Sequence, residues 1–208
     1  VKGLMLAKMR NGGAACTAAN RIYVARSIGD KFIAEFAKAM AAMKMGVGRE
    51  AGITLGASVS MKERNKIAEL VDGAKSRGAK VHTGATTPEG AGAFYPPTVI
   101  EVPQNDEILA HEVFGPVAPV VLFDTDEEAL KLANDTEYGL ISYVYSEDLK
   151  RAIRFAEGIE SGMVGINRGL LSDPAAPFGG VKQSGLGREG GFDGIHEFLQ
   201  TKYIGVEI

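Results

Sequence analysis

Between residues 117 and 167, short apolar runs alternate with segments of helical periodicity, and this alternation limits the fold more than any other feature. Strands are expected at 117–123, 140–145 and 163–167, with helices at 126–134 and 149–157 between them. A helix that connects two neighbouring strands places them parallel, and such helices cover the faces of the sheet. The pattern predicts an α/β fold, a three-layer αβα sandwich with a largely parallel sheet.

The residues before 117 continue this pattern. Proline has no N–H to give to a sheet ladder, so the pair Pro96–Pro97 in F-Y-P-P-T-V-I-E-V suggests an edge strand. The final segment, Tyr203 to Ile208, has strand character with no helix after it, and we expect it to pair outside the domain. The other expected elements are a helix end at 1–10, helices at 28–45 and 60–76, and strands at 21–25 and 79–83.

The composition is that of an ordinary soluble globular protein. Of the 208 residues, 45% are hydrophobic and 24% charged, and this length suits one large domain or two small ones. The net charge is -3, and no run of lysine or arginine marks a nucleic-acid or membrane surface. The single cysteine rules out an internal disulfide, and we expect a cytoplasmic protein. The chain opens in mid-helix without methionine or signal peptide, which suggests a fragment of a longer protein.

Two patterns that could carry chemistry lack the context they need. Gly185 to Gly190 matches the dinucleotide-binding pattern G-x-G-x-x-G, yet no apolar strand precedes it and the chain ends soon after it. The histidines, His82, His111 and His196, are too scattered for metal ligands or a Cys–His pair. We expect them to be structural or exposed, and we expect no metal.

The only cysteine lies in R-N-G-G-A-A-C-T-A-A-N-R, residues 10–21. Glycine and alanine on both sides leave nothing bulky to cover the sulfur of Cys16. If the following T-A-A-N continues as a helix, the thiol lies at its N-terminus, where backbone amides stabilise a thiolate and an oxyanion. Free cysteines are more often buried and inert, and the residues alone favour that interpretation.

Three segments in order resemble the aldehyde dehydrogenase superfamily. The cysteine loop is similar to the family's catalytic-cysteine segment, and E-V-F-G-P-V, residues 112–117, to its E-x-F-G-P-V. P-F-G-G-V-K-Q-S-G-L-G-R-E, residues 177–189, matches its P-F-G-G-x-K-x-S-G-x-G-R-E, with N-D-T-E-Y-G-L before it. The resemblance covers essentially the whole chain but only the C-terminal part of such an enzyme. It implies a catalytic domain at 1–200 and a strand at 201–208 for inter-domain or inter-subunit pairing, with the N-terminal cofactor domain absent.

The resemblance assigns roles to four of these residues. Cys16 matches the nucleophile that attacks the aldehyde to form a thiohemiacetal, which loses hydride to become a thioester that water hydrolyses. Glu112 matches the carboxylate that binds the hydroxyls of the nicotinamide ribose, and Phe114 a ring packed near the nicotinamide. Phe178 matches a side chain that lines the substrate tunnel. Taken alone, Glu112 reads as a solvated loop residue and both phenylalanines as core packing.

The start of the cysteine loop points to the substrate. A guanidinium beside an apolar tunnel is costly unless it binds an anion, so Arg10 suits an aldehyde with a distal carboxylate. The resemblance extends to the succinic semialdehyde dehydrogenases, and it implies Arg10 as a carboxylate ligand and Ser172 as a second one. The alternative interpretations are a surface arginine at a helix end and a serine in a loop turn.

The resemblance further implies NAD or NADP as the cofactor, a small-molecule aldehyde as the partner and a homo-oligomer, dimer or tetramer. The general base and most adenosine contacts of such enzymes come from the N-terminal domain, so the fragment alone is expected to be inactive. Ala14 replaces the usual Gln or Glu, and Ala18 excludes a redox disulfide in the loop. The alternatives are an enzyme for another aldehyde and a non-catalytic assembly module. The lack of a second cysteine disfavours a thiol-redox protein.

Overall fold

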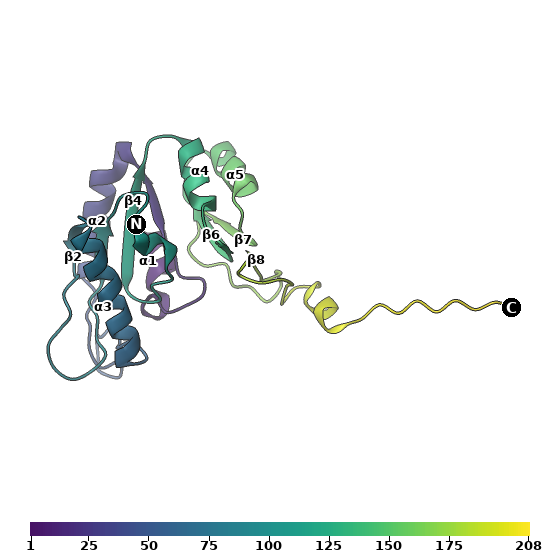
Figure 1. The fold of residues 1–208 in the computed structure, drawn as a ribbon, viewed down its shortest axis with the longest axis horizontal. Coiled ribbons are helices and arrows are strands. Elements are labelled where there is room, and N and C mark those ends of the chain that lie inside the picture. Colours follow the sequence, from purple (N-terminus) through teal and green to yellow (C-terminus); the bar gives the residue numbers. More distant parts are fainter.

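The computed structural model describes residues 1–208, which form a larger lobe, a smaller lobe and an extended tail (Figure 1). The larger lobe is built on a four-stranded sheet in the order β1-β4-β3-β2. The strands β1 (Ile22–Ala25), β4 (Val117–Phe123) and β3 (Thr98–Glu101) are parallel, and β2 (Lys80–Thr83) is antiparallel to β3. The sheet is mixed and mostly parallel, which confirms the predicted fold class.

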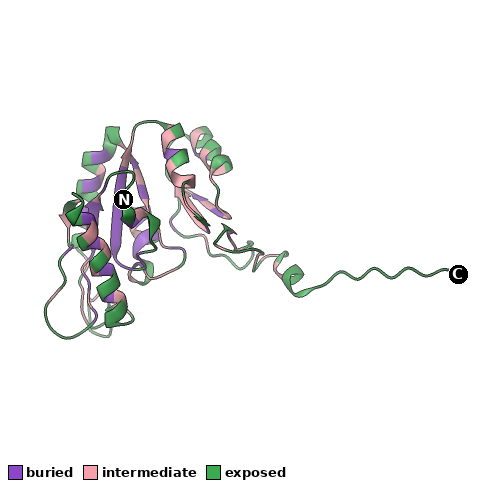
Figure 2. Cartoon of the chain, viewed as in Figure 1, coloured by how far each residue is buried: buried purple, intermediate pink, exposed green.

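Helices cover both faces of this sheet. The helices α1 (Lys2–Met9) and α2 (Gly29–Ala41) pack on one face, and α3 (Met61–Ser76) packs on the other. Successive residues of a strand point to opposite faces, so Val120 joins the core under α2 and Val121 the core under α3. Figure 2 shows the burial concentrated in these strands and the tail fully exposed.

In the smaller lobe, each of the two helices begins after a residue that caps its N-terminus. Thr125 accepts a hydrogen bond from Glu128 N and begins α4 (Asp126–Asn134), and Asp148 accepts from Lys150 N and begins α5 (Leu149–Gly158). These helices lie beside a parallel strand pair (Figure 1). The pair is β6 (Ile141–Val144) with β7 (Met163–Ile166), and a short antiparallel pair joins β5 (Tyr138–Gly139) to β8 (Val181–Lys182). The 3-10 turns are η1 (Arg10–Gly13), η2 (Arg26–Ile28), η3 (Glu107–Ala110) and η4 (Gly194–Phe198).

The prediction of an edge strand after Pro96–Pro97 is wrong. The strand β3 begins at Thr98, after both prolines, and lies between β4 and β2. The prolines therefore stay outside the ladder, which begins where Thr98 N donates to Pro116 O at 2.8 Å. The helix expected at 28–45 ends at Ala41. Residues 201–208 pair with no strand of this chain, so their pairing outside it stays a prediction. No helix combines the length and the apolar character needed to cross a membrane.

Candidate active site

Cys16 is exposed in a turn, and the helix expected after it is absent. The condition under which a helix N-terminus would support the thiolate is therefore not met. The preceding turn η1 bends through left-handed backbone at Asn11, with φ 52°, and at Gly13, with φ 79°. Asn11 Nδ2 donates to Ala14 O at 2.7 Å and closes the bend. The thiol is thus presented to solvent on a constrained backbone.

The cysteine loop lies next to the loop that carries Glu112. Because β1 and β4 are parallel neighbours, with Ile22 opposite Val120, the segments that lead into them reach the same edge of the sheet. Gly13 lies against Gly115, where any Cβ on Gly13 would collide with the Gly115 carbonyl oxygen. The two loops are therefore in direct backbone contact.

Asn20 joins these two loops with its side chain. Asn20 Nδ2 donates to His111 O at 2.7 Å, and Asn20 Oδ1 accepts from Val113 N at 3.0 Å. The two bonds lie on either side of Glu112 in the sequence. No motif pointed to Asn20, because its partners are far along the chain.

Glu112 and Phe114 are both exposed at this edge of the sheet. Phe114 has φ 53°, which is rare for a bulky side chain, and strained backbone of this kind clusters at functional sites. Lys66 of α3 donates its Nζ to Glu112 O at 3.1 Å, and Ile67 of the same helix packs against Gly115. The helix therefore fixes the backbone of the loop, while the Glu112 carboxylate remains outside any ion pair.

Arg10 reaches across the cysteine loop to the residue after Cys16. Its Nη2 donates to Thr17 Oγ1 at 2.7 Å. Tyr143 of β6 holds the same residue from the smaller lobe, with its OH donating to Thr17 O at 2.8 Å. Burial raises the pKa of Tyr143, against the lowering effects of the hydrogen bond to Thr17 and the charge of Arg10. The phenol therefore stays a hydrogen-bond donor at neutral pH.

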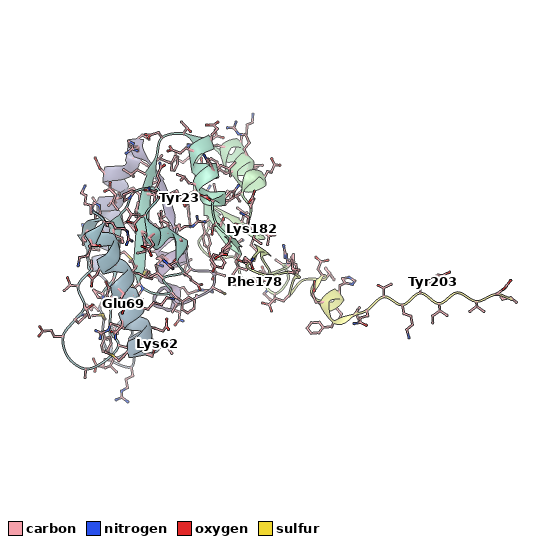
Figure 3. All side chains as sticks on the ribbon, viewed as in Figure 1. Tyr23, Lys62, Glu69, Phe178, Lys182 and Tyr203 are labelled. Carbon is pink, nitrogen blue, oxygen red and sulfur yellow. The ribbon has the colours of Figure 1, made fainter.

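Ser172 and Phe178 lie on the C-terminal motif, outside this network. Ser172 is exposed and has no hydrogen bond to Arg10, whose side chain bonds Thr17. Phe178 is half-buried, and its backbone pairs with Glu189 in two hydrogen bonds of 2.7 and 2.8 Å. Figure 3 shows Phe178 and Lys182 near the smaller lobe, from which the chain runs on to Tyr203. The structure thus brings Arg10, Cys16, Glu112 and Phe114 to adjoining loops and does not bond Ser172 or Phe178 to them.

Lys8 is a buried cation just before the cysteine loop. It lies in the last turn of α1 and is 1% exposed. Burial lowers the pKa of Lys8 to about 7, and the negative charge of Glu112 opposes this effect. The sequence contains no indication of this burial, because lysine is almost never fully buried.

The fold and the loops around Cys16 and Glu112 are those of a known family. Residues 1–204 match the model of the aldehyde dehydrogenase family, and the chain belongs to this family. It is 52% identical over 207 residues to a succinate-semialdehyde dehydrogenase of Paenarthrobacter nicotinovorans, and 45% identical over 205 residues to a glutarate-semialdehyde dehydrogenase of Pseudomonas aeruginosa. These matches cover 99% and 98% of this chain but 46% and 42% of the relatives, so the chain spans less than half of their length.

The structure of this chain also resembles solved structures of the family. The crystal structure of succinate-semialdehyde dehydrogenase from Burkholderia pseudomallei superposes with a TM-score of 0.92 at 42% identity. The match covers 95% of this chain and 41% of that one.

Proposed function

We propose that this chain carries the catalytic cysteine of an NAD- or NADP-dependent enzyme that oxidises succinic semialdehyde to succinate. The observation that carries the proposal is the exposure of Cys16 and Glu112 on adjoining loops that Asn20 joins. The site then combines a thiol nucleophile with a carboxylate that can accept from two neighbouring ribose hydroxyls.

The residues beside Glu112 suit a nicotinamide dinucleotide. The carboxylate is exposed and outside any ion pair, so its lone pairs are available to ribose hydroxyls. Phe114 is 39% exposed and offers a flat apolar face for the nicotinamide ring. A bound nicotinamide supplies the acceptor for the hydride that the oxidation releases.

Cys16 carries the covalent steps. Its sulfur attacks the carbonyl carbon of the aldehyde and forms a C–S bond, giving a thiohemiacetal. Loss of hydride from that carbon and of the proton from its hydroxyl leaves a thioester, and attack by water breaks the C–S bond, releasing the carboxylic acid and regenerating the thiol. The constrained turn at Asn11 and Gly13 holds the sulfur in place for these steps.

The chain offers no evident base for the hydrolytic step. Glu112 is assigned to the ribose, and the side chain of Cys16 is bonded to no histidine or carboxylate. We therefore expect the 208 residues on their own to react with thiol reagents at Cys16 without turning over aldehyde.

Arg10 supports an aldehyde with a carboxylate at its far end. The guanidinium uses one N–H on Thr17 and keeps further donors for a bidentate bond to a carboxylate. The two relatives named above are described as acting on succinate and glutarate semialdehydes, which share this carboxylate. We assign Ser172 as a second contact to the carboxylate and Phe178 to the wall of the substrate tunnel.

The substrate assignment is tested with Arg10→Ala in the complete protein. The KM for succinic semialdehyde should rise about tenfold or more, and the KM for propionaldehyde should change little, because only the first bears a carboxylate. Steady-state assays with NAD and with NADP measure this and decide between the cofactors. Arg168→Ala is the matched control, since Arg168 is exposed and bonds only to Leu170 O, at 2.9 Å.

Two results would contradict these assignments. Equal losses on both aldehydes would make Arg10 a structural partner of Thr17, as their 2.7 Å hydrogen bond allows, in an enzyme for another aldehyde. If the complete protein oxidises no aldehyde and Cys16 reacts with iodoacetamide no faster than a free thiol, the chain is a non-catalytic assembly module.

A further inference from the structure

The guanidinium of Arg10 is oriented by a buried hydroxyl. Arg10 is exposed, and its Nη2 donates to Thr17 Oγ1 at 2.7 Å, while Thr17 is only 5% exposed. A long side chain that is already held in one orientation loses less conformational entropy when it binds a ligand. Thr17 therefore prepares Arg10 for a bidentate bond to a carboxylate.

Tyr143 holds Thr17 from the smaller lobe. Its OH donates to Thr17 O at 2.8 Å, and the two residues lie 126 positions apart in the sequence. Burial is the main cause that raises the pKa of Tyr143, and the charges of Arg10 and Cys16 have smaller effects of opposite sign. The phenol thus keeps its proton at neutral pH, and it lies within electrostatic range of both side chains.

The ring of Tyr143 also lies beside the loop that carries Ser172. Tyr143 is opposite Gly165 in the parallel pair of β6 and β7, and a Cβ on Gly165 would lie 3.3 Å from Tyr143 Cδ1. The same Cβ would collide with Leu171 Cδ1, so the side chain of Leu171 occupies the space over Gly165 next to the ring. Leu171 directly precedes Ser172. One side chain thus joins the segments that carry both proposed ligands of the substrate carboxylate.

Packing alone does not require the OH of Tyr143. A phenylalanine ring would fill the same space beside Gly165 and Leu171 and would bring no polar group into a half-buried position. The OH is directed at one acceptor, the carbonyl oxygen of the residue that orients Arg10. Its contribution is therefore to the position of Thr17.

We infer that Tyr143 is a positioning residue for recognition of the distal carboxylate, because it fixes Thr17, which orients Arg10, and packs beside the Ser172 loop. The inference rests on the proposed function, which assigns Arg10 and Ser172 to that carboxylate. Since Tyr143 belongs to β6, the preference for a carboxylated aldehyde depends on how the smaller lobe holds the cysteine loop (Figure 1).

The test compares Tyr143→Phe with wild type in the complete protein, because phenylalanine keeps the ring over Gly165 and removes only the OH. Tyr145→Phe is the matched control, since Tyr145 is 46% exposed and lies outside the hydrogen bonds to the cysteine loop. Steady-state kinetics with succinic semialdehyde and propionaldehyde give kcat and KM. Calorimetric titrations with succinate and propionate give Kd values without turnover.

In Tyr143→Phe we expect the KM for succinic semialdehyde and the Kd for succinate to rise about threefold to tenfold. The kcat, the KM for propionaldehyde and the Kd for propionate should stay near wild type, as should all values of Tyr145→Phe. Thr17→Val should show the same selective loss. Thr17→Ser keeps the hydroxyl that accepts from Arg10 Nη2 and should bind succinate as wild type does.

A double variant decides whether the OH acts through Arg10. Arg10→Ala combined with Tyr143→Phe should bind succinate no more weakly than Arg10→Ala alone, and additive losses would overturn the inference. Equal losses on both aldehydes with slower alkylation of Cys16 by iodoacetamide would also overturn it, because the OH would then order the nucleophile. A lower Tm of Tyr143→Phe with unchanged KM and Kd values would reduce Tyr143 to a structural contact between the lobes.

The succinate titration separates this inference from the proposed function. A protein that oxidises no aldehyde but loses succinate affinity in Tyr143→Phe contradicts the proposed function and supports the positioning role. A protein that oxidises succinic semialdehyde and depends on Arg10 but not on the OH of Tyr143 contradicts only the positioning role. A protein that neither oxidises an aldehyde nor binds succinate contradicts both.

Discussion

The side chain of Asn20 links the two loops of the candidate site by hydrogen bonds to the backbone, as a paired strand would. Its amide holds the backbone at His111 and Val113, on either side of Glu112. An amide carries a donor and an acceptor in one plane, so a single side chain reproduces the two bonds that a residue of a parallel strand makes to the residues on either side of its neighbour. Together with Lys66 and the contact between Gly13 and Gly115, Asn20 therefore sets the position of Glu112 relative to Cys16.

Asn20→Leu removes both hydrogen bonds and leaves His111 O and Val113 N without partners. We expect the KM for the nicotinamide cofactor to rise about tenfold, while the KM for the aldehyde and the alkylation rate of Cys16 stay near wild type. Asn20→Asp keeps the acceptor for Val113 N and should lose less. Kinetics with varied cofactor and iodoacetamide labelling measure these effects. Slower alkylation with an unchanged cofactor KM would show that Asn20 orders only the cysteine loop.

Lys8 makes stability depend on pH. Its pKa is about 7 in the folded protein and near the ordinary 10.5 when unfolded. Between these values the unfolded chain binds a proton that the folded chain does not, so stability rises with pH over this window by at most about 1.4 kcal/mol per pH unit. Below pH 7 the contribution of Lys8 no longer changes with pH.

Lys8→Met should remove this slope and stabilise the protein near pH 7. Urea unfolding at pH 7, 8 and 9 measures the difference, with Lys31→Met, an exposed lysine of α2, as the control. If both variants keep the wild-type slope, the side chain of Lys8 is protonated and solvated in the folded protein.

Among single residues, the sequence identifies those that lie in short motifs, such as Cys16 and Glu112. It does not identify Asn20, Thr17 or Tyr143 as members of the same network. The bonds of Asn20 span 91 and 93 residues, and the bond from Tyr143 to Thr17 spans 126. Local spacing contains no information about contacts of that range, so these roles emerge only from the fold.

Among the elements, helix starts were predictable because capping is local. Thr125 and Asp148 cap α4 and α5 directly before the expected first residues, and Ser60, the expected first residue of the helix at 60–76, is the cap of α3. The neighbours of a strand are not a local property. The proline pair at 96–97 therefore misled the assignment of β3, which is internal because tertiary pairing with β4 and β2 begins after the prolines.

Lys182 ties the P-F-G-G motif to the end of α4. Its Nζ donates to Asn134 O at 2.9 Å and to Thr136 O at 3.1 Å, and it pairs with Glu160. These are carbonyls at and beyond the helix C-terminus, where a positive charge is favourable. One ammonium thus holds β8 against the end of α4 within the smaller lobe.

Lys182→Met should cost about 0.5–1.5 kcal/mol of stability, because it removes two hydrogen bonds and an ion pair that are exposed to water. The KM for succinic semialdehyde should rise if Phe178, on the same motif, lines the tunnel. Chemical unfolding and aldehyde kinetics measure the two effects, with the exposed Lys150→Met on α5 as the control. A loss of stability with unchanged kinetics would remove Phe178 from the substrate tunnel.

In the whole molecule, the cysteine loop lies where the two lobes meet. Tyr143 of the smaller lobe bonds Thr17 O, and Gly3 of α1 leaves the space that the Tyr145 ring fills. From the other side, Arg21 at the end of the cysteine loop donates to Ala133 O at 3.0 Å, at the end of α4. A shift of one lobe against the other would therefore move the backbone on both sides of Cys16.

The tail beyond the smaller lobe exposes several apolar side chains. Tyr203 is 91% exposed, Ile204 73% and Val206 78%, and the segment pairs with no strand of this chain (Figure 1). Unpaired backbone edges with apolar side chains are covered in native proteins, because they otherwise template aggregation. We propose that the protein is a homo-oligomer in which residues 201–208 add a strand to another domain or subunit.

Removal of residues 201–208 from the complete protein should convert the oligomer to protomers, because the backbone ladder and the apolar cover are lost together. Ile204→Asp should weaken assembly by burying an unpaired carboxylate at the new interface, and Lys202→Ala, at an exposed polar position, should leave it unchanged. Size-exclusion chromatography with light scattering over a range of concentrations gives the mass. A truncated protein that keeps the wild-type mass would instead assign the tail to pairing within one subunit, and its thermal stability should then fall independently of concentration.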